Sequence, residues 1–483
     1  MAGGRAFDLR KLINQNMKRK VNEDRFTDSD SSHRVVIKLK KSLHLPCFQP
    51  HNKTDVILRN HSFSWYRTLE QFHSATINKL FTSLKSEAIQ KLVTKARKVD
   101  PTYKPANFFS YYVANCPAGV NTDKLLKTLS KEKNIELAYV EKAPAVAPSV
   151  AINKNPIAKS QKYLDPAPTG IDAKYAWAYR GGDGEGRIKF IDIEQGWMLD
   201  HEDLSIKVLP FTGTNHEKFK DHGTAVMGAI LMRDNRTGGI GITPKANGHI
   251  ISQWRPDGSF NNADAIMSAI SYLEFGDILL LEAQCFDSPV SCKLWPLEIQ
   301  DAVFEAIRLA TALGIIVIEA AGNGNSKGKQ GNNLDNFRLL KKKILNRNSP
   351  DFKDSGAIIV GASSSNVPHQ KIDYSNCGNR IDCYAWGEDV VTAGYFPWSS
   401  GYATNTYTDK FNGTSSATAI VAGIAIAVQS IIEANHCTRL SPKQMRDILS
   451  SDLCGTRSAN GRLKDKIGVM PDLKKIIDKG LQD

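Results

Sequence analysis

Continuous apolar runs separated by helix-like stretches are the feature that most constrains the fold of this 483-residue chain. A run that is apolar on both faces is typical of a strand in a parallel sheet with helices on each side. Helical patterns lie between the runs, for example over Asn262–Phe275 and Leu297–Leu313. The alternation predicts an α/β domain with a doubly wound, mostly parallel sheet, whose site forms at the carboxyl ends of the strands. The apolar runs span Ile188–Ile193, His249–Ser252, Ile278–Leu281, Ile315–Ala320 and Ala357–Ala362.

Three short motifs supply a carboxylate, an imidazole and a hydroxyl, in that order along the chain. Asp192 ends a Phe-Ile-Asp run, His222 begins His-Gly-Thr, and Ser415 lies within Asn-Gly-Thr-Ser-Ser-Ala. A serine hydroxyl is a weak nucleophile at neutral pH and needs an adjacent base. We therefore predict a catalytic triad in which His222 takes the proton of Ser415, and Asp192 holds the imidazole and stabilises its cation.

Ser415 lies just before an apolar stretch, Ala417 to Val428, that predicts a buried helix. The first backbone N–H groups of a helix have no partner within the helix, and they lie at the positive end of its dipole. This position favours the oxyanion that forms when a serine attacks a carbonyl carbon.

The order of the three motifs and their flanking residues resemble the subtilisin-like (S8) family of serine endopeptidases. The resemblance covers residues 167–440 and includes His201-Glu202-Asp203-Leu204, which is similar to the family's His-Pro-Asp-Leu. Two positions depart from the family pattern. Asp192-Ile193-Glu194 replaces Asp-Thr-Gly, so that Glu194 stands where a glycine is usual, and Ala419 stands where the family has proline. The resemblance implies a subtilisin-like fold and peptide-bond hydrolysis through an acyl-enzyme intermediate.

By the same resemblance, Asn323 would donate its side-chain N–H to the oxyanion, together with the backbone N–H of Ser415. Asn323 ends an apolar strand in the sequence Ala-Ala-Gly-Asn, and the alternative is that it only terminates the strand in a turn. The resemblance also implies that Glu282, Gln284 and Gly322 bind the substrate residue before the cut. Glu282 would favour a basic residue there; the alternative is that its side chain points away and pairs elsewhere.

The N-terminal third predicts a separate small α+β domain. We expect a disordered tail at 1–33, a prosegment-like domain at 34–142, a linker at 143–166 and the peptidase domain at 167–483. Strands are predicted at Arg34–Lys40 and Ile135–Glu141, with a helix at Thr122–Lys131 between them. The pattern resembles the inhibitor-like prosegments of the family, which implies a domain that assists folding, covers the cleft and is cut near the linker. An accessory domain that stays attached is the alternative.

The excess positive charge of the chain lies entirely in this N-terminal third. The net charge is +13, and the first 150 residues hold 26 of the 63 basic and 13 of the 50 acidic residues. The strongest cluster, Lys18-Arg19-Lys20, has no interleaved aromatic residues, so we interpret it as a solvated tail and not as a nucleic-acid site. No apolar run is long enough for a membrane span. The expected partners are protein or peptide substrates and the chain's own prosegment, with no nucleic acid, no membrane and a monomeric state.

The signals for cellular location conflict. The N-terminus lacks the apolar segment of a Sec signal peptide, which leaves a cytoplasmic protein or export without such a signal. Three close pairs of cysteines invite disulfides and an oxidising compartment, and six reduced cysteines are the equal alternative. The pairs are Cys285/Cys292, Cys377/Cys383 and Cys437/Cys454.

The sequence predicts no cofactor and no catalytic metal. None of the cysteine pairs has the spacing of a zinc site. Structural calcium is common in the resembled family, and Asp203 and the Asp234-Asn235 loop offer oxygen ligands.

Two other classes of function remain open from the sequence. One is a catalytically silent member of the family that serves as a binding protein. The other is an esterase or amidase with the same triad, but such enzymes carry a Gly-x-Ser-x-Gly elbow, which Ser415 lacks.

Overall fold

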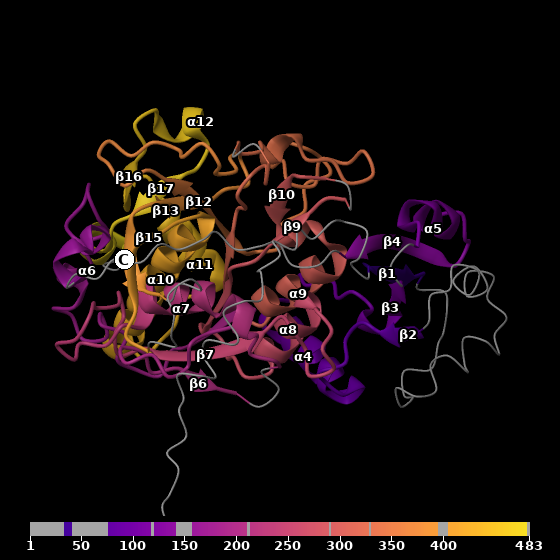
Figure 1. Cartoon of the computed structure of the whole chain (residues 1–483), viewed down its shortest axis with the longest axis horizontal. Coiled ribbons are helices and arrows are strands. Elements are labelled where there is room, and N and C mark those ends of the chain that lie inside the picture. Colours follow the sequence, from indigo (N-terminus) through magenta and orange to yellow (C-terminus); the bar gives the residue numbers. More distant parts are fainter. Residues whose placement is uncertain are drawn as a thin grey trace, which may run out of the picture.

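A computed structural model describes residues 33–40, 76–116, 120–141, 157–209, 213–288, 291–327, 330–394 and 404–480. A small N-terminal domain lies beside a larger α/β domain (Figure 1). Nearly all of the tail predicted at 1–33, and the linker as far as residue 156, lie outside the described residues.

The N-terminal domain is a four-stranded antiparallel sheet in the order β2-β3-β1-β4. Alternation along β1 separates its two faces, since Val35 and Ile37 pack with Leu125 of α5, whereas Val36 packs into the core shared with the large domain. The predicted elements at 34–40, 122–131 and 135–141 correspond to β1, α5 and β4. The elements are β1 His33–Leu39, β2 Thr76–Lys79, α4 Ser86–Val99, β3 Tyr111–Cys116, α5 Thr122–Leu129 and β4 Ile135–Glu141.

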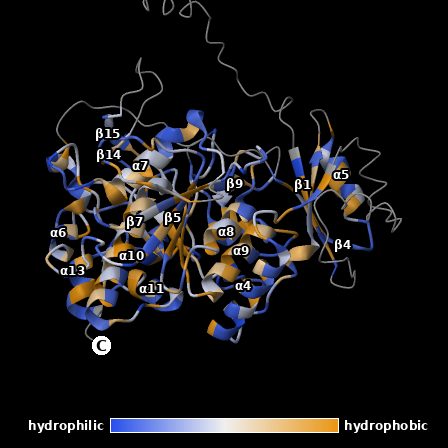
Figure 2. Cartoon of the chain, turned by 90° about the horizontal axis from the view of Figure 1, so that it is seen from below, coloured by the Kyte–Doolittle hydropathy of each residue, from blue (hydrophilic) through white to orange (hydrophobic). Residues whose placement is uncertain are grey.

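The large domain is built on a nine-stranded sheet in the order β16-β17-β13-β12-β11-β8-β5-β7-β6. Neighbouring strands are parallel except β16 and β17. Apolar residues are concentrated on β5 and the adjacent central strands (Figure 2). The predicted doubly wound α/β fold is confirmed. The strands are β5 Lys189–Glu194, β6 Lys207–Val208, β7 Asn247–Ser252, β8 Ile278–Leu281, β11 Ile316–Ala320, β12 Ile358–Ser363, β13 Cys383–Trp386, β16 Gly455–Arg457 and β17 Val469–Pro471.

Two helices pack against each other on one face of this sheet: α7 (Lys220–Leu231) and α10 (Thr414–His436). The pair α8 (Asn262–Ile270) and α9 (Asp301–Ala312) also packs together. Among the described helices, α10 has the length and apolar composition that a membrane span requires, but its apolar stretch is entirely buried in the protein. It is the core helix of the domain, which explains its composition without a membrane.

The N-terminal domain docks on α8 and α9 through two buried carboxylates. Asp264 accepts the backbone N–H groups of Thr82 and Ser83 at 2.7 and 2.8 Å. Asp301, the first residue of α9, accepts Lys38 Nζ at 2.9 Å and Tyr111 Oη at 2.7 Å. The two domains therefore share a polar interface as well as an apolar core.

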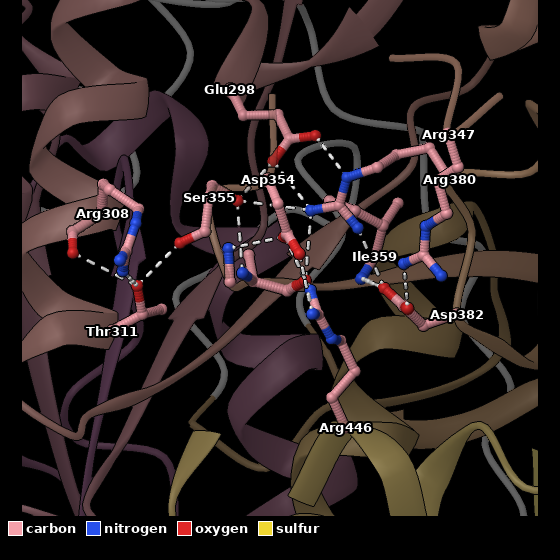
Figure 3. Close-up of polar contacts among 12 residues, drawn as sticks. Glu298, Arg308, Thr311, Arg347, Asp354, Ser355, Ile359, Arg380, Asp382 and Arg446 are labelled. Carbon is pink, nitrogen blue, oxygen red and sulfur yellow. Dashed lines mark hydrogen bonds and ion pairs between the residues drawn. The ribbon is translucent and has the colours of Figure 1, made fainter. Parts of the chain in front are cut away.

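A buried ion cluster joins the segment just before α9 to the segments just before β12 and β13 (Figure 3). Arg380 is fully buried and donates to Glu298 from Nε and from a terminal nitrogen, at 2.7 and 2.9 Å, and to Asp382 at 3.0 Å. Ser355 Oγ donates to Glu298 at 2.6 Å, and Arg347 binds Asp382 at 2.6 Å. Arginine thus pairs with both Glu298 and Asp382.

The seven cysteines in the described ranges are all free thiols. The three predicted pairs are therefore reduced in the structure. Burial raises the pKa of several of these thiols, that of Cys116 to about 11, and so keeps them protonated.

Candidate active site

A histidine and a carboxylate meet at the carboxyl end of β5. His222 lies in the first turn of α7, and its Nδ1 is 2.5 Å from Oε1 of Glu194, the last residue of β5. Both side chains are buried, with 6% and 4% of their surfaces exposed. The Nε2 atom of His222 is buried and has no hydrogen-bond partner. An imidazole held at Nδ1 by a carboxylate, with Nε2 free, is arranged to act as a base.

The structure contradicts the prediction that Asp192 holds this imidazole. Asp192 lies inside β5, level with Ile250 of β7 and Leu280 of β8, and it is fully buried. Its Oδ2 accepts the indole N–H of Trp197 at 2.8 Å, and its Oδ1 has no partner. Glu194 is two residues further along the same face and one methylene longer, so the glutamate contacts His222.

Ser415 is placed as the sequence predicts, at the amino end of α10. The helix begins at Thr414, and Ser415 is 4% exposed. Because α10 packs along α7, the serine and the histidine come from neighbouring helices on one face of the sheet.

Asn323 is oriented by the residue before the serine. Its Oδ1 accepts both the backbone N–H and the hydroxyl of Thr414, at 2.8 and 3.0 Å. Because the amide oxygen is occupied in this way, the Nδ2 group faces elsewhere and remains a donor. This arrangement suits an oxyanion donor better than a simple strand terminus does.

The two other residues predicted to bind substrate flank Asn323. The side chain of Gln284 accepts the backbone N–H of Asn323 at 2.8 Å, so Gln284 supports this turn. Gly322 has φ of +93°, and a Cβ there would meet Asn376 Nδ2 at 2.9 Å, so only glycine fits. Direct contact of either residue with a substrate stays a prediction.

Glu282 is a buried carboxyl at the end of β8. It follows β8, is 5% exposed, and neither of its carboxyl oxygens has a hydrogen-bond partner. Burial first, and then the charges of Asp192 and Glu194, raise the pKa of Glu282 well above its ordinary value, and the nearby Ser415 hydroxyl lowers it in part. Burial and Glu194 likewise raise the pKa of Asp192. The predicted preference for basic substrates is untested by this arrangement.

The model of the subtilase family (peptidase S8) matches residues 193–469, more than half of the chain. The chain belongs to the subtilase family. It is therefore a serine-type endopeptidase, as its relatives are.

Several subtilisins are similar to this subtilase along most of their own length. Subtilisin DY of Bacillus licheniformis is 29% identical over 284 residues, which cover 58% of this chain and 87% of the relative. Subtilisin E of Bacillus subtilis is 25% identical over 385 residues, which cover 78% and 82%. Among solved structures, fervidolysin from Fervidobacterium pennivorans is 14% identical with a TM-score of 0.52, covering 93% of this chain and 61% of that one. This likeness supports the fold.

The sequence does contain a motif that marks Glu194, two residues after Asp192, as the carboxylate beside the histidine. Glu194-Gln195-Gly196 keeps the carboxylate, polar residue and glycine of the family's Asp-Thr-Gly, with glutamate for aspartate. The family match begins at residue 193, so it includes Glu194 and leaves Asp192 out. Gly196 is also required sterically, because a Cβ there would lie 2.5 Å from the carbonyl oxygen of His216.

The calcium prediction rests on Asp203. One of its oxygens accepts Gly239 N–H at 3.2 Å, and the other is buried without a partner. Burial raises the pKa of Asp203 to about 6. Within the described ranges, no three His, Cys, Asp or Glu side chains come together as a metal site. A single carboxylate does not define a calcium site, and we assign no metal to this subtilase.

Proposed function

We propose that this subtilase hydrolyses peptide bonds with Ser415 as nucleophile, His222 as general base and acid, and Glu194 as the carboxylate that holds the imidazole. The 2.5 Å contact between Glu194 and His222 Nδ1 carries the proposal. It fixes the histidine tautomer and leaves Nε2 for the proton of the serine.

The reaction follows from these positions. As Ser415 Oγ bonds to the scissile carbonyl carbon, its proton passes to Nε2 of His222, and Glu194 stabilises the imidazolium. The oxyanion receives hydrogen bonds from Asn323 Nδ2 and from the backbone N–H of Ser415. The imidazolium then protonates the leaving amine, and water hydrolyses the acyl-enzyme by the same route in reverse.

We also propose that the N-terminal domain is a prosegment that the enzyme itself removes within 143–166. Two observations support this. The charge of Glu141, at the end of β4, acts on Cys285 in the segment that follows Glu282, so the chain leaves the domain close to that segment. An alignment with subtilisin E that covers 78% of the chain must also include part of the N-terminal domain, even if it extends to the last residue.

The test compares the wild type with Ser415→Ala by intact mass after incubation. Loss of about the first 150 residues from the wild type alone would support both the triad and self-processing. If both proteins stay full length but only the wild type cleaves added casein, the peptidase stands and the N-terminal domain is a permanent accessory domain. If neither protein cleaves anything over a range of pH, the silent binding protein becomes the better description.

A further inference from the structure

Three carboxyl groups lie together on the face of the sheet that carries the catalytic residues. Strands β5 and β8 are parallel neighbours, with Asp192 level with Leu280 and Ile193 level with Leu281. Side chains alternate along a strand, so Asp192, Glu194 and Glu282 point to the same side. Their exposed fractions are 0%, 3% and 5%.

No basic side chain within the described ranges forms an ion pair with Asp192 or Glu282. Among the described residues, the only ion pair of Glu194 is with His222, and its other oxygen accepts the backbone N–H of Gln195 at 3.2 Å. Glu282 is the least satisfied of the three, because both of its oxygens lack a hydrogen bond. A buried carboxyl without partners is costly, and such groups are concentrated at functional sites.

The helix that carries Ser415 packs against both elements that hold unpartnered groups: α7, which carries His222, and β8, which Glu282 directly follows. Among the described residues the buried Nε2 of His222 has no hydrogen-bond partner, and the carboxyl of Glu282 lies near enough to Ser415 for the serine hydroxyl to affect its ionisation. A hydroxyl has a single proton to donate. It can be directed to the histidine or to the glutamate, but not to both.

We propose that Glu282 is a positioning residue for Ser415: as a neutral acid it leaves the hydroxyl to His222, and as a carboxylate it accepts the hydroxyl proton in a hydrogen bond and withdraws it from His222. The proposal rests on the proposed role of Ser415 as nucleophile. It makes the enzyme lose activity as the pH rises through the ionisation of Glu282. It also predicts no preference for Lys or Arg before the cut, because the carboxyl faces the serine and two other acids.

The surrounding groups favour the neutral form of Glu282. Burial is the largest cause of its raised pKa, and the neighbouring acids Asp192 and Glu194 add to it. The first turn of α10 brings no acidic residue. From α7 come His222, which is paired with Glu194, and Lys220 and Asp221; burial raises the pKa of Asp221 to about 7. The pKa of Asp221 lies inside the pH range of the assay below, so Asp221 needs its own control.

The experiment is a profile of kcat/KM against pH, from 5 to 10, on a short peptide substrate without ionisable groups. The proteins are the wild type, Glu282→Gln, Asp221→Asn and Ser415→Ala. Glutamine has the shape of glutamate and cannot ionise. We expect kcat/KM of the wild type to fall at least ~10-fold towards the alkaline end of the profile, and that of Glu282→Gln to show no such fall. Asp221→Asn should keep the fall of the wild type.

A second measurement separates the hydroxyl from substrate binding and from folding. The rate at which a fluorophosphonate labels Ser415 reports the nucleophile directly, and the final extent of labelling counts the folded sites. The labelling rate of the wild type should show the same alkaline fall, and that of Glu282→Gln should not.

The outcomes distinguish the two proposals. Identical profiles for the wild type and Glu282→Gln would overturn the role of Glu282, as would loss of the fall in Asp221→Asn. Activity or labelling that persists in Ser415→Ala would instead overturn the proposed function itself.

Discussion

The two faces of the central sheet bury carboxylates in opposite ways. On the face towards α9, Arg380 binds both Glu298 and Asp382 (Figure 3). On the face towards α7 and α10, Asp192 and Glu282 have no cationic partner in the described structure, and three of their four oxygens lack a hydrogen bond. The same sheet thus carries an arginine-paired cluster of acids on one side and acids without a cation on the other. Glu319, which lies on the α9 face outside that cluster, is an exception, because its Oε2 is buried without a hydrogen bond among the described residues.

The difference separates acids that stabilise the fold from acids that belong to the proposed active site. A buried carboxylate costs several kcal/mol unless a well-placed cation offsets that cost, and arginine does so on the α9 face. On the catalytic face an arginine would compete with His222 for Glu194. Burial raises the pKa of Asp192 and Glu282 and so favours their neutral forms, while Glu194 is the acid that contacts the histidine. Buried acids without a cation are costly, and such a cost is expected at a functional site.

The largest expected effect distinguishes the two acids of β5. Glu194→Gln should lower kcat/KM by about 10⁴-fold, because glutamine cannot stabilise the imidazolium or fix its tautomer. Asp192→Asn keeps an acceptor for Trp197 and should cost less than about tenfold. Steady-state kinetics on one peptide substrate measure both variants. A larger loss for Asp192→Asn would restore Asp192 as the catalytic acid.

The next largest effect is on the stability of the protein, and it tests the buried Arg380 cluster. Arg380→Met leaves Glu298 and Asp382 without their cation and should lower the free energy of unfolding by about 3–5 kcal/mol. Arg457→Met breaks an exposed pair with Asp452 and should cost less than about 1 kcal/mol. Urea unfolding measures both, in the Ser415→Ala background to prevent self-digestion. Equal losses would show that the buried cluster is no more important than a surface pair.

Strand β11 carries Glu319, a buried acid of the fold, and Asn323, the proposed oxyanion donor, follows the end of the same strand. Asn323→Ala should lower kcat by about 10²–10³-fold, since it removes one proposed oxyanion donor. Glu319 lies on the α9 face, where burial raises its pKa. In the Glu319→Gln variant, glutamine can still accept the backbone N–H of Glu298. We expect its kcat to match the wild type. A kcat for Asn323→Ala within a few-fold of the wild type would reduce Asn323 to a turn residue.

The smallest effect is on how the free energy of unfolding depends on pH, and we expect opposite signs for Glu282 and Asp354. Glu282 has a raised pKa in the folded state, so its contribution is fully present below its ordinary value of 4.5 and is lost as the pH rises towards the folded value. Glu282→Gln should therefore gain stability relative to the wild type as the pH rises above 4.5.

Asp354 provides the opposite case. Hydrogen bonds and charge from Arg446 and the charge of Arg380 hold the pKa of Asp354 below its ordinary value of 3.8 against the effect of burial. Its contribution is present above that value and is lost as the pH falls through the folded pKa. Asp354→Asn should lose stability at neutral pH and approach the wild type in acid. Urea unfolding at several pH values checks both variants, and the same sign for both would remove the contrast between the two faces.

Much of the fold could be predicted because it depends on local patterns. The apolar runs at β5, β8 and β11 show that these strands are covered on both faces, and Ser415 and His222 each mark the start of a helix. The state of the cysteines could not be predicted. The spacing of cysteines in the sequence does not say whether their side chains point towards each other. In the structure all seven described cysteines are free thiols.

The position of the catalytic acid was misassigned for a related reason. Asp192 and Glu194 lie two residues apart on one face of β5, so the alternation of the strand makes them equivalent candidates. The choice depends on where the strand ends relative to α7, and that is a tertiary relation.

The sequence by itself determined the fold class, the family and the residue types of the proposed site, because the residues proposed as nucleophile, base and oxyanion donor each lie at the end of a helix or strand. Only the tertiary structure decided which carboxylate meets His222 and brought Glu282 beside Ser415. Those contacts join β5, β8, α7 and α10, which are far apart in the chain, and the depth of a side chain in the packed sheet is set by neighbours that no local pattern contains.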